Sequence, residues 1–246
     1  MRIKLLSLLT AATALALPVS SWSQSIYTSG HGDIGVGYDS ITQEFEPHWH
    51  LEVGAVVDGN PLAADTEYEP ANLIARTSST RTSPTGLNSI LGVADGSTIY
   101  AMGSATYQPN LGFGAEELNP VDWIGNITVT LTSWTIPLVA EAALYTTNIA
   151  GTTVVDRIFS TYAPGATDSG NTFTIVPGDH LHFQWAFTHI GTYDFTLTWS
   201  GTHVSDGLIT TSATYTMDVI PEPSTYALLL LGLGVLTWIR FRPVRA

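Results

Sequence analysis

The chain has no cysteine, and it has few basic residues outside its two ends. The lack of cysteine excludes disulfides and thiolate metal sites. Between residues 24 and 220 there is no lysine, and the only arginines are Arg76, Arg81 and Arg157. All 21 acidic residues except Glu222 lie in this stretch, so its formal charge is 3 − 20 = −17. We therefore expect no nucleic-acid partner, because phosphate binding requires clustered lysine or arginine.

Residues 24–220 also lack any sustained helical period. Short runs rich in Thr, Val, Ile, Tyr and Trp are separated by Gly, Pro, Asn and Asp, which is typical of strands and turns. Apolar side chains alternate with polar ones in residues 125–137, 171–176, 182–188, 192–200 and 208–219. The pattern predicts an all-β fold, a single antiparallel β-sandwich of immunoglobulin-like type.

Three details of that fold can be predicted from the sequence. The predicted core includes Trp185, Phe187, Tyr193, Phe195 and Leu197, and the last three share one face by their spacing. Tyr193 also resembles the tyrosine of a tyrosine corner, a folding feature. Between residues 63 and 114 the alternation weakens, which predicts long loops or edge strands.

The N-terminus has the pattern of a secretory signal peptide. Arg2 and Lys4 precede an apolar stretch, residues 5–17, and small residues flank Trp22 at Ser21 and Ser23. We expect signal peptidase to cleave after Ser23. Residues 1–23 are thus assigned to the signal peptide, and residues 24–220 to a surface domain that is exported.

The C-terminus, residues 221–246, carries a second apolar segment. Residues 224–241 number 18, roughly 27 Å as a helix, which is just long enough to span a bilayer. The arginines that follow predict that the body of the protein faces away from the cytoplasm. The residues that define the segment at its two ends are Pro221, Glu222, Pro223, Arg240 and Arg242.

This arrangement closely resembles the PEP-CTERM sorting signal of Gram-negative bacteria. The resemblance implies recognition by an exosortase, cleavage near residues 221–223, and delivery to the cell surface or extracellular matrix after transient anchoring in the inner membrane. An exopolysaccharide matrix then becomes a candidate partner. A plain membrane anchor is the alternative.

The body has a resemblance of its own. Residues 179–219 and the His-Gly-Asp start at residues 31–33 look like parts of the choice-of-anchor M domain, a surface-protein module. The matching features include the pair His180 and His182 and the corner at residues 191–193, although Ile190 stands where that family usually has proline. The resemblance implies a surface module with no activity to carry over.

Histidine supplies the chemistry that this sequence can offer. On a strand, residues two apart project from one face, so each His-x-His pair can offer two imidazoles to one ion. Such ligands suit zinc or another divalent transition metal. Asp33, two residues from one histidine, is a possible ligand or supporting carboxylate. The candidate metal ligands are His31, His48, His50, His180, His182 and His189.

Other chemistry has less support in the sequence. Glu44, Glu46 and Glu52 surround one histidine pair, but nothing fixes their separation for glycosidase work. We therefore expect no enzymatic activity. The predicted function is a surface or matrix protein that acts as an adhesion or binding module. The alternatives are a metal-capture protein of the cell surface, and a carbohydrate-active or carbohydrate-binding protein, which would require exposed tryptophan and glutamate in a groove.

Overall fold

The structure is a computed structural model that describes residues 24–103, 107–162, 171–221 and 233. Most of the sorting signal, including Glu222, Pro223, Arg240 and Arg242, lies outside these residues, as does the predicted signal peptide, 1–23. The described part has no helix that is long and apolar enough to cross a membrane. The predicted span, residues 224–241, falls almost wholly outside that part.

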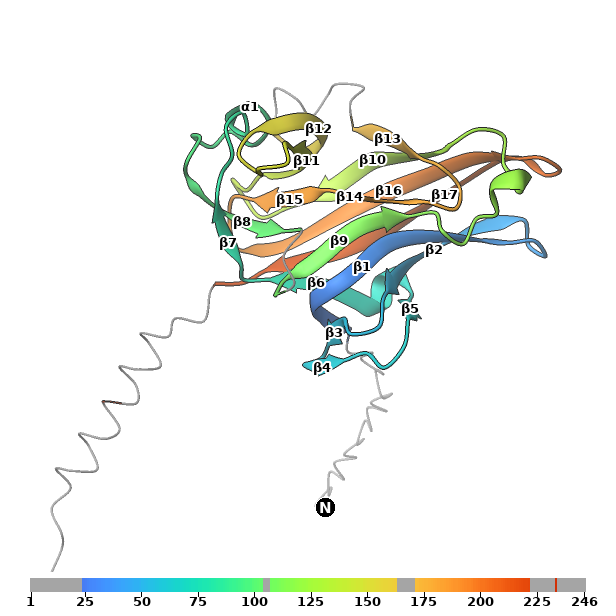
Figure 1. Cartoon of the computed structure of the whole chain (residues 1–246), viewed down its shortest axis with the longest axis horizontal. Coiled ribbons are helices and arrows are strands. Elements are labelled where there is room, and N and C mark those ends of the chain that lie inside the picture. The colour runs from blue at the N-terminus through green and yellow to red at the C-terminus, as the bar shows by residue number, and fades with distance from the viewer. Residues whose placement is uncertain (1–23, 104–106, 163–170, 222–232, 234–246) are drawn as a thin grey trace, which may run out of the picture.

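The described chain is all-β with two sheets, as the sequence predicts (Figure 1). One layer of the larger sheet consists of β13 (Thr172–Ile175), β10 (Ile127–Thr135), β16 (Gly191–His203), β17 (Gly207–Val219) and β6 (Leu73–Thr77). Its continuation consists of β14 (His180–His182), β9 (Pro109–Gly114), β1 (Ser25–Asp39), β2 (Glu44–Leu51) and β5 (Thr66–Tyr68), with the short β3 (Val56–Val57) and β4 (Asn60–Pro61) beside β1. The smaller sheet consists of β12 (Val154–Ser160), β11 (Ala142–Thr147), β15 (Gln184–Phe187), β8 (Thr98–Met102) and β7 (Thr80–Thr82). The helices are short: η1 (Pro70–Asn72), α1 (Asn88–Leu91) and η2 (Pro120–Asp122).

Aromatic side chains fill the space between the layers. Trp49 of β2 meets Tyr215 of β17 with ring centroids 5.1 Å apart, and Trp185 of β15 meets Phe195 of β16 at 5.5 Å. All four are buried, as are Phe187, Tyr193 and Leu197 of the predicted core. The apolar half of each alternating strand therefore faces this core, and its polar half faces outward.

The strand β1 joins the two layers of the larger sheet. Its first residues pair with β6, and from Gly30 onward it runs between β9 and β2. Gly30 has φ +98°, and an added Cβ would lie 2.7 Å from Ala55 Cα, so both conformation and space require glycine at this transition.

Three strand pairs correct the expectation of a purely antiparallel, immunoglobulin-like sandwich. The pairs β1 with β6, β1 with β9, and β6 with β17 are parallel. Parallel neighbours need long crossover connections, and the sequence pattern does not reveal strand direction. The expectation of loops or edge strands in residues 63–114 is wrong for β6 and β9, which both lie inside the larger sheet.

The outward side of β10, β16 and β17 carries hydroxyl groups in rows. Neighbouring strands join them by hydrogen bonds, such as Thr196 to Thr214 at 2.9 Å and Thr198 to Ser212 at 2.7 Å. We call this surface the threonine face, and its hydroxyls belong to Thr128, Thr130, Thr132, Thr196, Thr198, Ser200, Thr210, Ser212 and Thr214.

Candidate metal centre

The strand register places the two His-x-His pairs on one outward surface of the larger sheet. One row across β14, β9, β1 and β2 contains His180, Gly114, Gly35 and His48. The next row contains His182, Gly112, Asp33 and His50, and it continues to Glu67 of β5. The residues between them along each strand, such as Ile34 and Trp49, are buried in the core. We call this surface the histidine face. Its histidine and carboxylate side chains are His31, Asp33, His48, His50, Glu67, His180 and His182.

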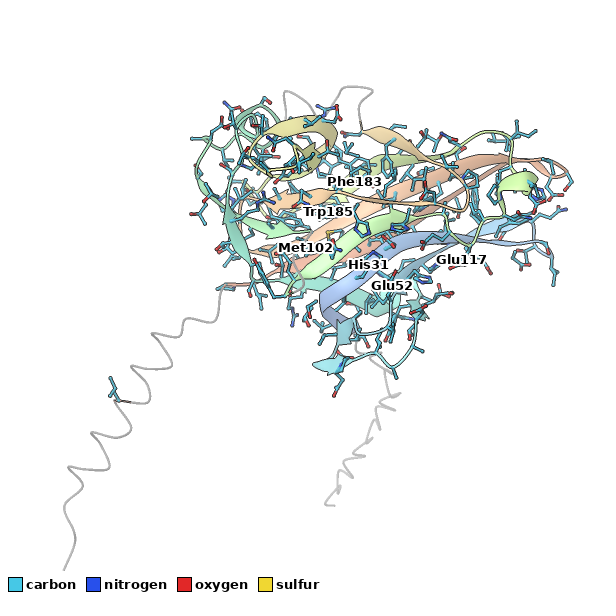
Figure 2. All side chains as sticks on the ribbon, viewed as in Figure 1. His31, Glu52, Met102, Glu117, Phe183 and Trp185 are labelled. Atoms are coloured by element: carbon cyan, nitrogen blue, oxygen red, sulfur yellow. The ribbon has the colours of Figure 1, made fainter. Side chains whose placement is uncertain are left out.

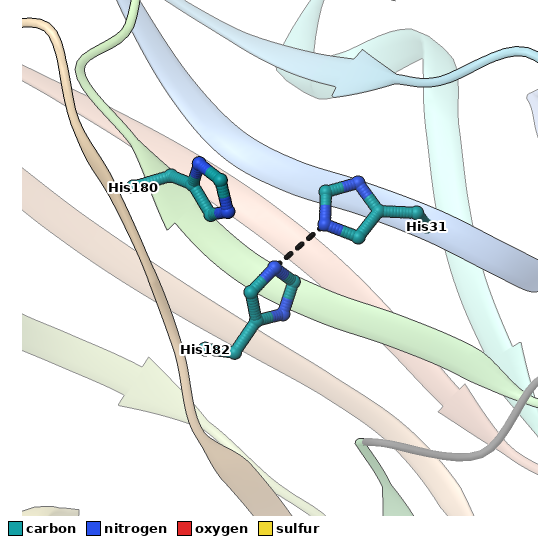
Figure 3. Close-up of side chains that lie close together, drawn as sticks. All are labelled: His31, His180 and His182. Carbon is teal, nitrogen blue, oxygen red and sulfur yellow. Dashed lines mark hydrogen bonds between the residues drawn. The ribbon is translucent and has the colours of Figure 1, made fainter.

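Three histidines from two strands converge at one end of this face. His31 of β1 and His182 of β14 bring their Nε2 atoms to 2.6 Å, although β9 lies between the strands (Figure 3). The His180 ring centroid lies 5.7 Å from that of His31 and 5.2 Å from that of His182. One ring nitrogen from each of the three lies within 4.8 Å of the other two. We call this group the three-histidine cluster.

Carboxylates lie behind two of these imidazoles, one at ion-pair distance and one in a hydrogen bond. His31 Nδ1 lies 2.9 Å from Glu52 Oε1, and Figure 2 shows these two side chains close together. His180 Nδ1 donates to Glu116 Oε1 at 2.7 Å. In both histidines the carboxylate lies on the Nδ1 side of the ring, so Nε2 is the ring nitrogen for a ligand. A carboxylate behind a histidine is the usual support of a metal-bound imidazole.

Asp33 is the most unusual group of the histidine face. It is 1% exposed, neither carboxylate oxygen has a hydrogen-bond partner, and Oδ1 lies 3.9 Å from His182 Nε2. Burial raises the pKa of Asp33 to about 7, against the opposing charge of His180. A Cβ added at Gly112 would overlap Asp33 Oδ1, so the carboxylate occupies space that only glycine leaves open. A bound cation would compensate this buried charge.

The remaining electrostatics of the cluster keep one imidazole neutral. Burial, helped by the neighbouring His31 and His180, lowers the pKa of His182 to about 4. Burial also acts to lower the pKa of His180, but the hydrogen bond to Glu116 and the charge of Asp33 outweigh it and raise that pKa. Neutral imidazole is the form that binds a metal ion, so His182 is in its ligand form at neutral pH.

The structure does not bring both His-x-His pairs to a single ion. The strands β14 and β2 are separated by β9 and β1, and His48 and His50 lie beside Glu117 instead. His189, the sixth predicted ligand, lies away from the histidine face. Its Nδ1 is 2.8 Å from Thr188 Oγ1, and its carbonyl accepts a hydrogen bond from Tyr193 at 2.7 Å, which is the predicted tyrosine corner.

Sequence reasoning missed the supporting glutamates of the loop after β9. Glu116 and Glu117 reach the face because β9 lies in the middle of the sheet, and the pattern of residues 63–114 did not indicate that position. Glu52 stood out only as an acidic neighbour of the histidine pair on β2. No signal in the sequence links it to His31.

A carbohydrate-binding groove would require exposed tryptophan side chains. Trp49, Trp123, Trp185 and Trp199 are buried, and Trp134 is half-buried. In the part of the chain that the structure describes, tryptophan thus offers no exposed stacking platform on the histidine face.

Comparisons with known proteins bear on the C-terminus. A family model described as the PEP-CTERM protein-sorting motif matches residues 219–245. The motif implies processing by an exosortase, export, and a location at the surface or outside the cell. No curated protein and no solved structure matches the chain. The choice-of-anchor M domain is not shown by these comparisons, and it stays a prediction.

Proposed function

We propose that the protein is a non-enzymatic binding module of the cell surface or extracellular matrix that captures a divalent transition metal, zinc foremost, at the three-histidine cluster. One observation carries this proposal. Three imidazoles converge beside Asp33, a buried carboxylate without a hydrogen-bond partner.

The ligand set is suited to zinc. Zinc takes imidazole nitrogen readily, and three histidines leave a fourth position for water or a carboxylate. His31 and His182 lie so close that, without an ion, one Nε2 must hold a proton between them. A metal ion would replace that proton and would be attracted by the carboxylate of Asp33. The charge of this carboxylate is otherwise costly to bury.

The surroundings favour capture over catalysis. The cluster lies on the outward side of a sheet, and its three histidines are all partly exposed. The acidic body, with formal charge −17 over residues 24–220, attracts cations to the surface. An exported domain of this kind would hold metal at the cell surface or in the matrix.

Zinc titration tests the proposal. The full chain, purified in detergent and stripped with chelator, is titrated with zinc at pH 7.5 by calorimetry. We expect stoichiometric binding tighter than about 10 μM, and His180→Ala with His182→Ala should remove one bound equivalent. The matched control, Thr196→Ala with Thr198→Ala on the threonine face, should bind as the parent does. Parental zinc binding by the histidine variant would refute the proposal.

The sorting step has its own test. Mass spectrometry of the surface fraction from the native host should find a mature protein that ends near Pro221. A major species that ends at Ala246 would instead identify a retained membrane anchor.

A further inference from the structure

A second group of metal-binding side chains lies on the histidine face, on the far side of Asp33 from the three-histidine cluster. It consists of His48, His50, Glu67 and Glu117. One ligand atom from each lies within 4.8 Å of the others. Glu117 Oε1 lies 3.0 Å from His48 Nε2 and 3.4 Å from His50 Nδ1. We call this group the mixed cluster.

Glycines leave the space that the mixed cluster occupies. A Cβ at Gly35 would lie 2.6 Å from His48 Nε2, and a Cβ at Gly37 would lie 2.8 Å from Glu117 Oε2. Neither glycine has a positive φ, so glycine is needed at these two positions for space and not for backbone conformation. A small open hollow at this place is lined by Gly35, His48, His50, Gly114, Glu116 and Glu117.

Both ring nitrogens of His48 face acceptors. The side chain is 7% exposed, and its Nδ1 lies 2.9 Å from the carbonyl oxygen of Glu46. A carbonyl can only accept, so Nδ1 donates to Glu46, and Nε2 is the ring nitrogen that lies beside Glu117, where a cation would take the place of the proton shared with the carboxylate. The hydrogen bond to Glu46 is the support that a metal-bound histidine requires, and here the backbone provides it.

We propose that the mixed cluster is a second divalent-cation site, separate from the three-histidine cluster. Its ligands are His48, His50 and Glu117, with Glu67 at the rim. The strands β2 and β14 are three strand spacings apart, roughly 14 Å, so the two histidine pairs serve different ions.

The ligand chemistry predicts a difference in ion preference. The three-histidine cluster offers imidazole nitrogens, whereas the mixed cluster combines two imidazoles with two carboxylates. Carboxylate oxygen suits harder ions such as manganese(II). The mixed cluster is therefore the manganese(II) site of the pair, and zinc also fits it.

Manganese(II) titration followed by electron paramagnetic resonance tests this inference. Bound manganese(II) loses the six-line signal of the free ion. The chelator-stripped full chain should bind one equivalent, and His180→Ala with His182→Ala should leave that binding unchanged. Glu117→Gln, which preserves size at a part-exposed position, should weaken manganese(II) binding at least about tenfold, since it removes a charged ligand. The matched control Glu44→Gln, at an exposed carboxylate of β2, should bind as the parent does.

The outcomes separate this inference from the proposed function. Absent manganese(II) binding, or parental affinity in Glu117→Gln, overturns the second site and leaves the zinc result at the three-histidine cluster standing. If His180→Ala with His182→Ala abolishes manganese(II) binding, the mixed cluster is not an independent site. Loss of one zinc equivalent in that variant with retained manganese(II) binding supports both.

Discussion

The histidine face and the threonine face are both outward sides of strands whose other side packs in the core. On the threonine face each hydroxyl row is joined between β16 and β17 by a hydrogen bond of 2.7 to 3.2 Å. On the histidine face Asp33 and His48 are buried, and both oxygens of Asp33 lack partners. One face satisfies its own polar groups, and the other leaves a charge to be satisfied by something else.

The two faces also differ in their glycine content. Outward positions of β1 and β9 on the histidine face hold Gly35, Gly37, Gly112 and Gly114, whereas the outward positions of the threonine face hold hydroxyl residues. Glycine weakens a strand, so its presence in the middle of a sheet needs a compensating reason. Here the reason is space for imidazole and carboxylate groups above the backbone.

The largest expected effect comes from removing that space. Gly112→Ala places a Cβ against Asp33 Oδ1 and 2.6 Å from the Leu181 carbonyl oxygen. We expect a loss of about 3 kcal/mol or more in the free energy of unfolding, measured with denaturant, because one of the two clashing atoms belongs to the backbone. Gly114→Ala on the same strand, whose Cβ would lie 3.4 Å from Asp33 Cβ, is the matched control and should cost less. Equal costs would show that the glycines do not shape the histidine face.

Metal-linked stability should distinguish the two faces next. Zinc at 100 times its dissociation constant should stabilise the parent by about 2.7 kcal/mol, because it binds only the native state. In His180→Ala with His182→Ala, the gain from this cluster should vanish. In Thr196→Ala with Thr198→Ala the full gain should persist, as thermal unfolding with and without zinc will measure. A gain that is equal in both variants would remove the distinction between the faces.

Asp33→Asn should change metal-free and metal-bound stability in opposite directions. Without metal the amide replaces a buried, unpartnered charge. The free energy of unfolding, measured with chelator present, should therefore rise by about 1–3 kcal/mol. Zinc affinity should fall, because the neutral amide no longer balances the ion. A variant that is less stable without metal would indicate that Asp33 has partners that stabilise the fold.

The smallest effect concerns a carboxylate that is fully paired. Asp206, in the turn between β16 and β17, accepts from Tyr38 at 2.5 Å and from Gln43 at 2.9 Å, and lies 2.5 Å from His203 Nδ1. The hydrogen bond from Tyr38 lowers the pKa of Asp206. Its contribution to stability is therefore present above the ordinary value of 3.8 and is lost as pH falls through the lowered one. Asp206→Asn should slightly lower the free energy of unfolding at pH 7. It should also make that free energy depend less on pH on the acid side. An Asp206→Asn variant as stabilising as Asp33→Asn would contradict the contrast.

The sequence could predict which residues share a face, but not which strands are neighbours. Alternation correctly placed Tyr193, Phe195 and Leu197 in the core, and the two-residue spacing placed His180 and His182 together. Convergence with His31 depends on the parallel pairing of β1 with β9, which is a long-range contact that no local pattern encodes.

The same reasoning explains what was missed at the mixed cluster. Glu117 joins His48 and His50 only because the loop after β9 extends toward β2. The glycines that weaken the strand signal in residues 109–114 are those that open the face. The glycines that made β9 hard to predict from the sequence are therefore the residues that the site requires.

Anomalous diffraction at the zinc edge tests the central claim most directly. In crystals of the protein grown with stoichiometric zinc at pH 7.5, the difference density should show a peak among the three-histidine cluster, with zinc to nitrogen distances of about 2.0–2.1 Å. A fully occupied zinc ion elsewhere, with His31, His180 and His182 unbound, would contradict the account.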